Sequence, residues 1–83
     1  MPAVELPPFT DTQREAVRRC RFVTPNVART HAWCLTEDEA TAAAIGKYTR
    51  YRRFAEPASY EYEIAVTHPD GVAFICDLVD GGR

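Results

Sequence analysis

The sequence predicts an α+β fold, in which a small three-stranded, mainly antiparallel sheet packs against one main helix, with a short N-terminal helix. Capping-box patterns at Thr10 and Thr36 mark two helix starts. Residues 60–66 alternate strictly, with aromatic and branched side chains on one face and glutamates on the other, which is typical of a strand with one wet face. A turn signal at residues 68–71 separates this strand from a second apolar run, so we expect an antiparallel hairpin there.

The chain of 83 residues is long enough for one modest core. Residues 1–9 contain three prolines and are expected to form an extended N-terminal arm, followed by a single domain over residues 10–83. A domain of this size has little room for a deep active-site cleft with supporting residues around it. We therefore expect a binding role and no enzymatic activity.

Thr10 with Gln13 and Thr12 with Glu15 both fit the capping-box pattern, so the first helix is expected to begin at one of these two threonines and to run to about Cys20. Residues 24–26, Thr-Pro-Asn, read as a turn because proline presets one backbone angle and asparagine tolerates unusual ones. The alternation over residues 27–35 predicts the first strand.

The main helix is expected to begin at Thr36, which pairs with Glu39 in a capping box, and to continue to about Arg53. Pro57 ends it, because proline disfavours helical angles in the residue before it.

The hairpin is expected to join residues 60–66 to residues 72–79. Its first strand should point its apolar side chains into the core and its carboxylates toward water. The inward set is Tyr60, Tyr62, Ile64 and Val66, and the outward set is Glu61 and Glu63.

Charge is divided unevenly along the chain. Nine of the ten basic residues precede residue 55, so the two parts carry formal charges of +3 and −5 under a net charge of −2. Such asymmetry indicates one region that attracts anions and one that repels them, and it bears on partners more than on fold.

Residues 47–54 interleave four cations with three aromatic rings, a combination that can bind a phosphate backbone and stack on bases. The same cations would also complement the dipole at a helix C-terminus, so both readings stay open. Residues 35–46 superficially resemble the first helix and turn of a helix-turn-helix unit, and this resemblance implies DNA binding through residues 47–54.

Five residues have side chains of the types that bind zinc: Cys20, His31, Cys34, His68 and Cys76. The sequence has no paired-cysteine knuckle, and positions 31 and 34 of one strand point to opposite faces. We expect reduced cysteines in the core, no metal, no cofactor and no covalent catalysis. No apolar run is long enough for a membrane span and the N-terminus lacks a signal-peptide pattern, so a cytoplasmic location is expected.

The function predicted from these features is a small non-catalytic interaction protein that binds a protein or nucleoprotein partner, with a homodimer also possible. Exposed tyrosine and arginine are enriched where proteins bind each other. The predicted binding residues are Tyr48, Arg50, Tyr51, Arg52, Arg53, Arg18 and Arg19. In size and in its alanine- and arginine-rich composition, the chain resembles phage-encoded inhibitors of host defence, anti-CRISPR proteins among them. This resemblance implies that the chain modulates its partner. No residue motif supports the resemblance. The alternative is a nucleic-acid-binding transcriptional regulator that uses residues 47–53.

Overall fold

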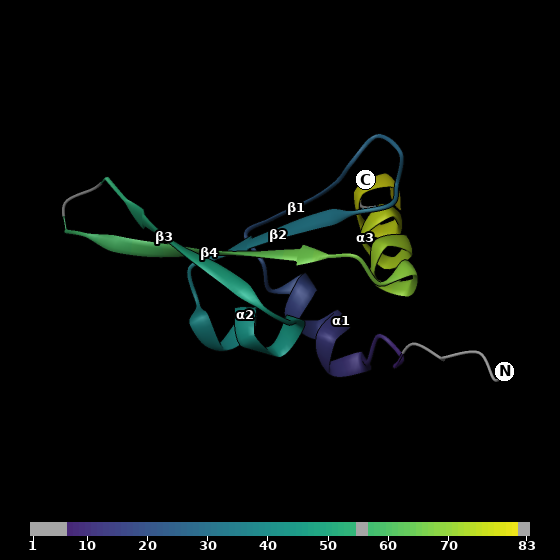
Figure 1. The fold of residues 1–83 in the computed structure, drawn as a ribbon, viewed down its shortest axis with the longest axis horizontal. Coiled ribbons are helices and arrows are strands. Elements are labelled where there is room, and N and C mark those ends of the chain that lie inside the picture. Colours follow the sequence, from purple (N-terminus) through teal and green to yellow (C-terminus); the bar gives the residue numbers. More distant parts are fainter. Residues whose placement is uncertain (1–6, 55–56, 82–83) are drawn as a thin grey trace, which may run out of the picture.

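The computed structural model describes residues 7–54 and 57–81 and confirms the α+β class (Figure 1). Over these residues the sheet has four antiparallel strands in the order β1-β2-β4-β3, one strand more than predicted, and three helices accompany it. In chain order the elements are α1 (Asp11–Arg18), β1 (Phe22–Pro25), β2 (Ala32–Thr36), α2 (Glu39–Ile45), β3 (Tyr48–Arg53), β4 (Ser59–Val66) and α3 (Pro69–Gly81).

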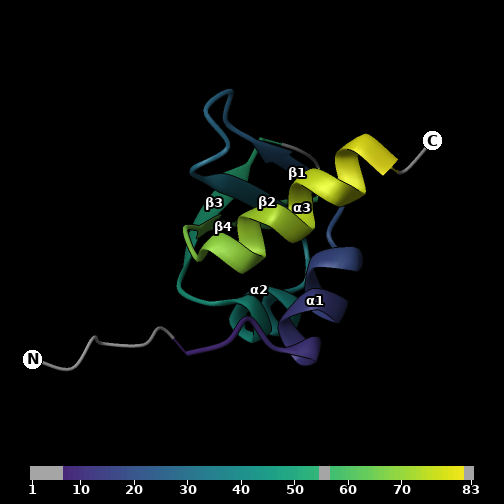
Figure 2. The ribbon, with the colours of Figure 1, turned by 90° about the vertical axis from the view of Figure 1, so that its right-hand side faces the viewer.

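All three helices share one core with the same face of the sheet (Figure 2). Along β2, buried and half-buried residues alternate, and along the C-terminal half of β4 buried residues alternate with half-buried or exposed ones. The fully buried side chains are led by Val17 of α1, Cys34 of β2, Ile64 of β4 and Ile75 of α3. The opposite face of the sheet is left without a helix among the described residues.

Helix α1 forms where the capping box predicts it. Thr10 Oγ1 accepts the backbone N–H of Gln13 at 3.1 Å, and Gln13 Oε1 accepts the backbone N–H of Thr10 at 2.8 Å. These two bonds satisfy amide groups that have no partner inside the helix. Phe9, in the predicted N-terminal arm, is buried in the core; residues 1–6 of that arm lie outside the described part of the chain.

The prediction of one helix over residues 36–53 is wrong. Helix α2 covers only Glu39–Ile45, and its N-cap is Asp38, whose carboxylate accepts the backbone N–H of Thr41 at 3.0 Å. Thr36 is the buried last residue of β2, and its hydroxyl accepts the N–H of Asp38, so the expected capping box does not form.

Residues 48–53 form β3 where helix was expected. Tyrosine and threonine favour strands, and β4 offers a full backbone ladder from Tyr48 opposite Ile64 to Arg53 opposite Ser59. Such tertiary pairing overrides a weak helix propensity. The resemblance of residues 35–46 to a helix-turn-helix unit therefore fails, because strand β3 and not a second helix comes directly after α2.

The first half of the sheet is also arranged differently from the prediction. Thr24 and Pro25 end strand β1 instead of forming a turn, and β1 pairs with a shorter β2 than the predicted strand 27–35. Asn26 shapes the intervening loop, since its Oδ1 accepts the backbone N–H groups of Thr30 and His31.

The predicted strand over residues 72–79 is helix α3, so β4 forms its hairpin with β3. His68 Nδ1 accepts the backbone N–H of Asp70 at the helix start, and Pro69 occupies the first helical position, where proline needs no hydrogen-bond donor. Val72, Ile75 and Cys76 then fall on one buried helical face.

The face prediction for β4 holds for Tyr62, Ile64 and Val66, which are buried. It is wrong for Tyr60, which is 44% exposed because the outer end of the hairpin extends past the helices (Figure 1). Glu61 and Glu63 lie on the opposite face, as predicted, and are half-buried there.

Candidate partner-binding surface

The hairpin of β3 and β4 extends beyond the helices (Figure 1). Every residue of β3 is exposed. Five of the seven predicted binding residues lie on this strand, and strand geometry divides them between two faces of the sheet.

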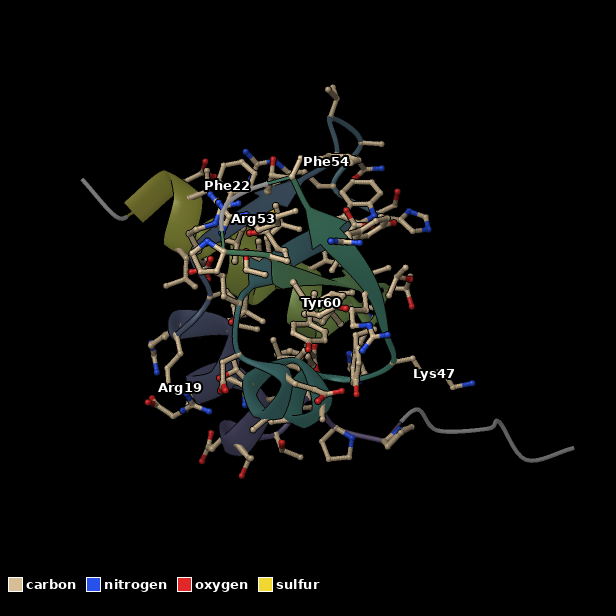
Figure 3. All side chains as sticks on the ribbon, turned by 90° about the vertical axis from the view of Figure 1, so that its left-hand side faces the viewer. Arg19, Phe22, Lys47, Arg53, Phe54 and Tyr60 are labelled. Carbon is tan, nitrogen blue, oxygen red and sulfur yellow. The ribbon has the colours of Figure 1, made fainter. Side chains whose placement is uncertain are left out.

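On the helix side, the hairpin carries Tyr48, Arg50, Arg52 and Tyr60. Tyr48 and Arg50 lie opposite buried residues of β4, and Arg52 lies opposite Tyr60. The Arg50 guanidinium carbon lies over the Tyr60 ring, 4.5 Å from its centroid. Tyr48 packs edge-on against Tyr62, with ring centroids 5.4 Å apart. Figure 3 views the hairpin from its tip, with Tyr60 on the helix side of the strands and with Arg53 and Phe54 toward the other side.

Tyr48 also connects the hairpin to α2. Its hydroxyl donates a hydrogen bond to Glu39 Oε2 at 2.6 Å, and this bond raises the pKa of the tyrosine above its usual value. The negative carboxylate favours the protonated phenol. Tyr48 is thus a neutral hydrogen-bond donor at neutral pH.

The other side of the sheet, which we call the open face, has an apolar half and a charged half. The apolar half consists of Phe22 opposite Leu35 and Trp33 opposite Ala65. The His31 ring stacks against Trp33, with centroids 6.4 Å apart.

The charged half of the open face lies on the hairpin. Arg53 pairs with Glu37, and Arg21 Nη2 lies 2.7 Å from Glu61 Oε2. Tyr51 is half exposed beside these pairs. Each ion pair stabilises the fold only modestly because it is accessible to water.

Arg18 and Arg19 lie apart from β3, at the C-terminal end of α1. Arg18 pairs with Glu15 at 2.6 Å, and its guanidinium lies over the Phe74 ring. Figure 3 shows Arg19 beside the helices, away from Lys47 and Arg53. The fold therefore places the seven predicted binding residues in two separate regions.

In the folded chain, the basic first part and the acidic second part of the sequence partly neutralise each other. Arg21 pairs with Glu61, and Arg29 Nη1 lies 2.8 Å from Asp80 Oδ2, so cations of the first part neutralise carboxylates of the second. The cations at Lys47, Arg50 and Arg52 form no ion pair within the described residues.

Phe22 and Leu35 were not among the predicted binding residues. Phe22 was assigned to no strand, and the face of residue 35 could not be interpreted without knowing its neighbours. The apolar alternation at 22 and at 33 and 35 was the available signal.

The histidines and cysteines are engaged within the fold. His68 uses both ring nitrogens, one toward the N–H of Asp70 and the other toward the carbonyl of Pro7. Hydrogen bonding to Cys20 and burial raise the pKa of Cys34 far above its usual range. No group of three or more histidine, cysteine or acidic side chains in residues 7–54 and 57–81 is arranged to hold a metal ion.

A hollow of about 570 Å³ lies between the N-terminal segment, the end of α2 and the end of β4. Its polar groups include His68 and Gln13, whose Nε2 donates to the carbonyl of Ile45 at 2.9 Å. His68 and Gln13 are thus both engaged in hydrogen bonds within the fold. Among the helices that the structure describes, none is long and apolar enough to cross a membrane.

No family model, curated protein or solved structure matches this chain.

Proposed function

We propose that the chain is a non-catalytic interaction protein that binds a protein partner through the open face and the β3–β4 hairpin. The observation that carries this proposal is the one-sided placement of the three helices. It leaves Phe22, Trp33, Leu35 and Tyr51 on a face that no described helix covers.

The exposed rings are the side chains from which a partner would gain most. Phe22 is 49% exposed and Tyr51 is 50% exposed. Full burial of a large apolar side chain contributes about 1.5–3 kcal/mol, and the half still exposed here is available to a partner. Such rings beside charged pairs match the apolar centre and polar rim of protein interfaces.

The charges of the open face favour a protein over a nucleic acid. Arg53 and Arg21 pair with Glu37 and Glu61 on this face, and Glu63 adds a further carboxylate, so the described part of this face has no excess of positive charge to attract a phosphate backbone. Nucleic-acid binding is the second candidate, supported by the exposed cations Arg50 and Arg52 on the helix side of the hairpin and by the exposed Lys47 just before β3. The predicted roles as a phage-type inhibitor and as a homodimer stay predictions.

The proposal is tested by affinity capture from native lysate, with and without nuclease treatment. The three baits are the wild-type chain, a Phe22→Ser/Tyr51→Ser variant and a Val79→Ser control. Val79 is a comparably exposed apolar residue of α3. The wild-type and control baits should retain the same protein, and the double variant should lose it. Capture that disappears with nuclease, or that the double variant retains in full, would contradict the proposal.

A further inference from the structure

We propose that the free edge of β3 binds an extended acidic segment of the partner as a fifth strand. This inference rests on the proposed function and deepens it, because it specifies the backbone conformation and charge of the bound segment. Main-chain hydrogen bonds would give affinity, and alternate side chains would give specificity.

The β3 edge is open along its whole length. The strand pairs with β4 on one side, and all six of its residues are exposed. Alternate residues of an edge strand direct backbone N–H and C=O groups away from the sheet, ready to pair with another chain. The figures show no described element beside this edge (Figures 1 and 3).

The other edge of the sheet is protected. Strand β1 has only four residues, ends in Pro25 and lies against α3. Short length, proline and a covering helix are the devices by which proteins block strand addition. Within the described part of the chain, the β3 edge has none of these protecting features, so its backbone groups can pair with an added strand.

The charges of β3 specify an acidic occupant. Arg50 and Arg52 lie two residues apart on the helix-side face, so both side chains point the same way. Neither forms an ion pair within the described residues, and the ring of Tyr60 supports Arg50. Glutamates at alternate positions of an added strand would lie directly opposite these two arginines.

A second copy of this chain is a poor occupant of the same edge. An antiparallel pair of β3 strands centred on Arg50 places Arg50 opposite its own copy, and one centred on Tyr51 places Arg50 opposite Arg52. Like charges directly opposite each other on neighbouring strands are destabilising. A nucleic acid would satisfy the arginines but lacks the regular donors and acceptors that pair with a strand.

The probe is a capped peptide of about eight residues that alternates glutamate with valine, long enough to cover the strand. Two further peptides carry N-methyl groups on alternate amides, one in each phase, so that each blocks donors along one edge of the peptide. Binding to the full chain is followed by fluorescence anisotropy, and protection of the β3 amides by NMR hydrogen exchange. Oligothymidylate of equal charge serves as the nucleic-acid competitor.

The protein variants are Arg52→Glu and, as a control with the same change of charge, Arg19→Glu on α1. If the peptide adds as a strand, only the N-methylated peptide whose blocked amides face β3 should fail to bind, and the other N-methylated peptide should bind normally. It also predicts protection of β3 amides, about a tenfold weaker affinity for Arg52→Glu, and little change for Arg19→Glu.

Equal binding of all three peptides, or equal weakening by both variants, would overturn strand addition, since attraction would then depend on charge alone. Failure of the peptide to bind would also overturn it, while the open-face capture experiment could still uphold protein binding. Displacement by a more tightly bound oligothymidylate would overturn both the inference and the proposed function.

Discussion

The guanidinium of Arg50 lies over the ring of Tyr60, 4.5 Å from its centroid, and links β3 to β4 where the helices no longer cover the hairpin. A cation over a tyrosine face is attracted by the negative face of the ring. The contact restrains an arginine that would otherwise rotate freely, and so orients its charge before a partner arrives.

A double-mutant cycle with Arg50→Ala and Tyr60→Ala measures this link. The coupling should be about 0.5–1 kcal/mol of unfolding free energy, as for exposed cation–π pairs. Denaturant titration of the two single variants and the double variant gives the value. A coupling of zero would show that Arg50 is not restrained by the ring.

Gly71 is expected to tolerate no side chain. A Cβ atom there would lie 2.7 Å from Val66 Cγ1 and 2.8 Å from Phe9 Cε1, well inside contact distance. Gly71→Ala should therefore destabilise the fold by about 1–3 kcal/mol, although alanine favours a helix by about 1 kcal/mol over glycine. Gly81→Ala is the matched control at the end of α3, where a Cβ meets nothing within 4 Å. Equal stability of the two variants would contradict the close packing of α3 on β4.

Asp38 should make the folding stability of the protein depend on pH. Hydrogen bonds from the Thr41 hydroxyl and backbone N–H lower the pKa of Asp38 below its usual value. A carboxyl whose folded-state pKa is lowered contributes stability above its unfolded pKa, about 3.9, and loses that contribution as pH falls through the folded value. The stability gap between the wild type and Asp38→Ala should be widest near neutral pH and narrow in acid.

Chemical denaturation of both proteins across this pH range tests the prediction. Thr36→Ala serves as a comparison, because Thr36 is a buried strand residue and does not cap α2. Asp38→Asn keeps a capping side chain but should lose the acid-dependent component. A gap that widens in acid would contradict the assignment of Asp38 as the cap.

The three cysteines should differ in reactivity. A hydrogen bond from Cys34, together with the nearby charge of Arg19, lowers the pKa of Cys20 despite burial. Cys34 and Cys76 are buried. Iodoacetamide should alkylate Cys20 about tenfold faster than either buried thiol, because thiolate character and access control the rate. Peptide mass spectrometry measures the alkylation rate of each cysteine, with urea-unfolded protein as the control. Faster labelling of Cys34 in the folded protein would contradict its buried environment.

The elements that depend on interactions between residues close in sequence could be predicted. The Thr10 and Gln13 capping box places α1, and the alternation of residues 60–66 places the core face of β4 at Tyr62, Ile64 and Val66. Both patterns specify bonds or burial within a few neighbouring residues. The α+β class followed from these elements.

The missed elements depend on long-range partners or on ambiguous signals. Strand β3 forms because β4 pairs with it, which residues 47–53 alone do not reveal. Residues 68–71 fit a turn as well as a helix start, and the spacing of Val72, Ile75 and Cys76 was the stronger, helical signal. The open face was missed for the same reason, since Phe22 and Leu35 join only when β1 pairs with β2.

Site-specific photo-cross-linking in cells that naturally make the protein tests whether the β3–β4 hairpin binds a protein partner. A benzophenone amino acid replaces Tyr51 or Phe54 on the hairpin and, as controls, Thr12 on α1 or Ala73 on α3, all four of them exposed. The account predicts one protein adduct of the same mass from both hairpin positions, unchanged by nuclease, and no such adduct from the helix positions. Adducts that nuclease removes, or that form only from Thr12 and Ala73, would contradict a protein partner bound at the hairpin.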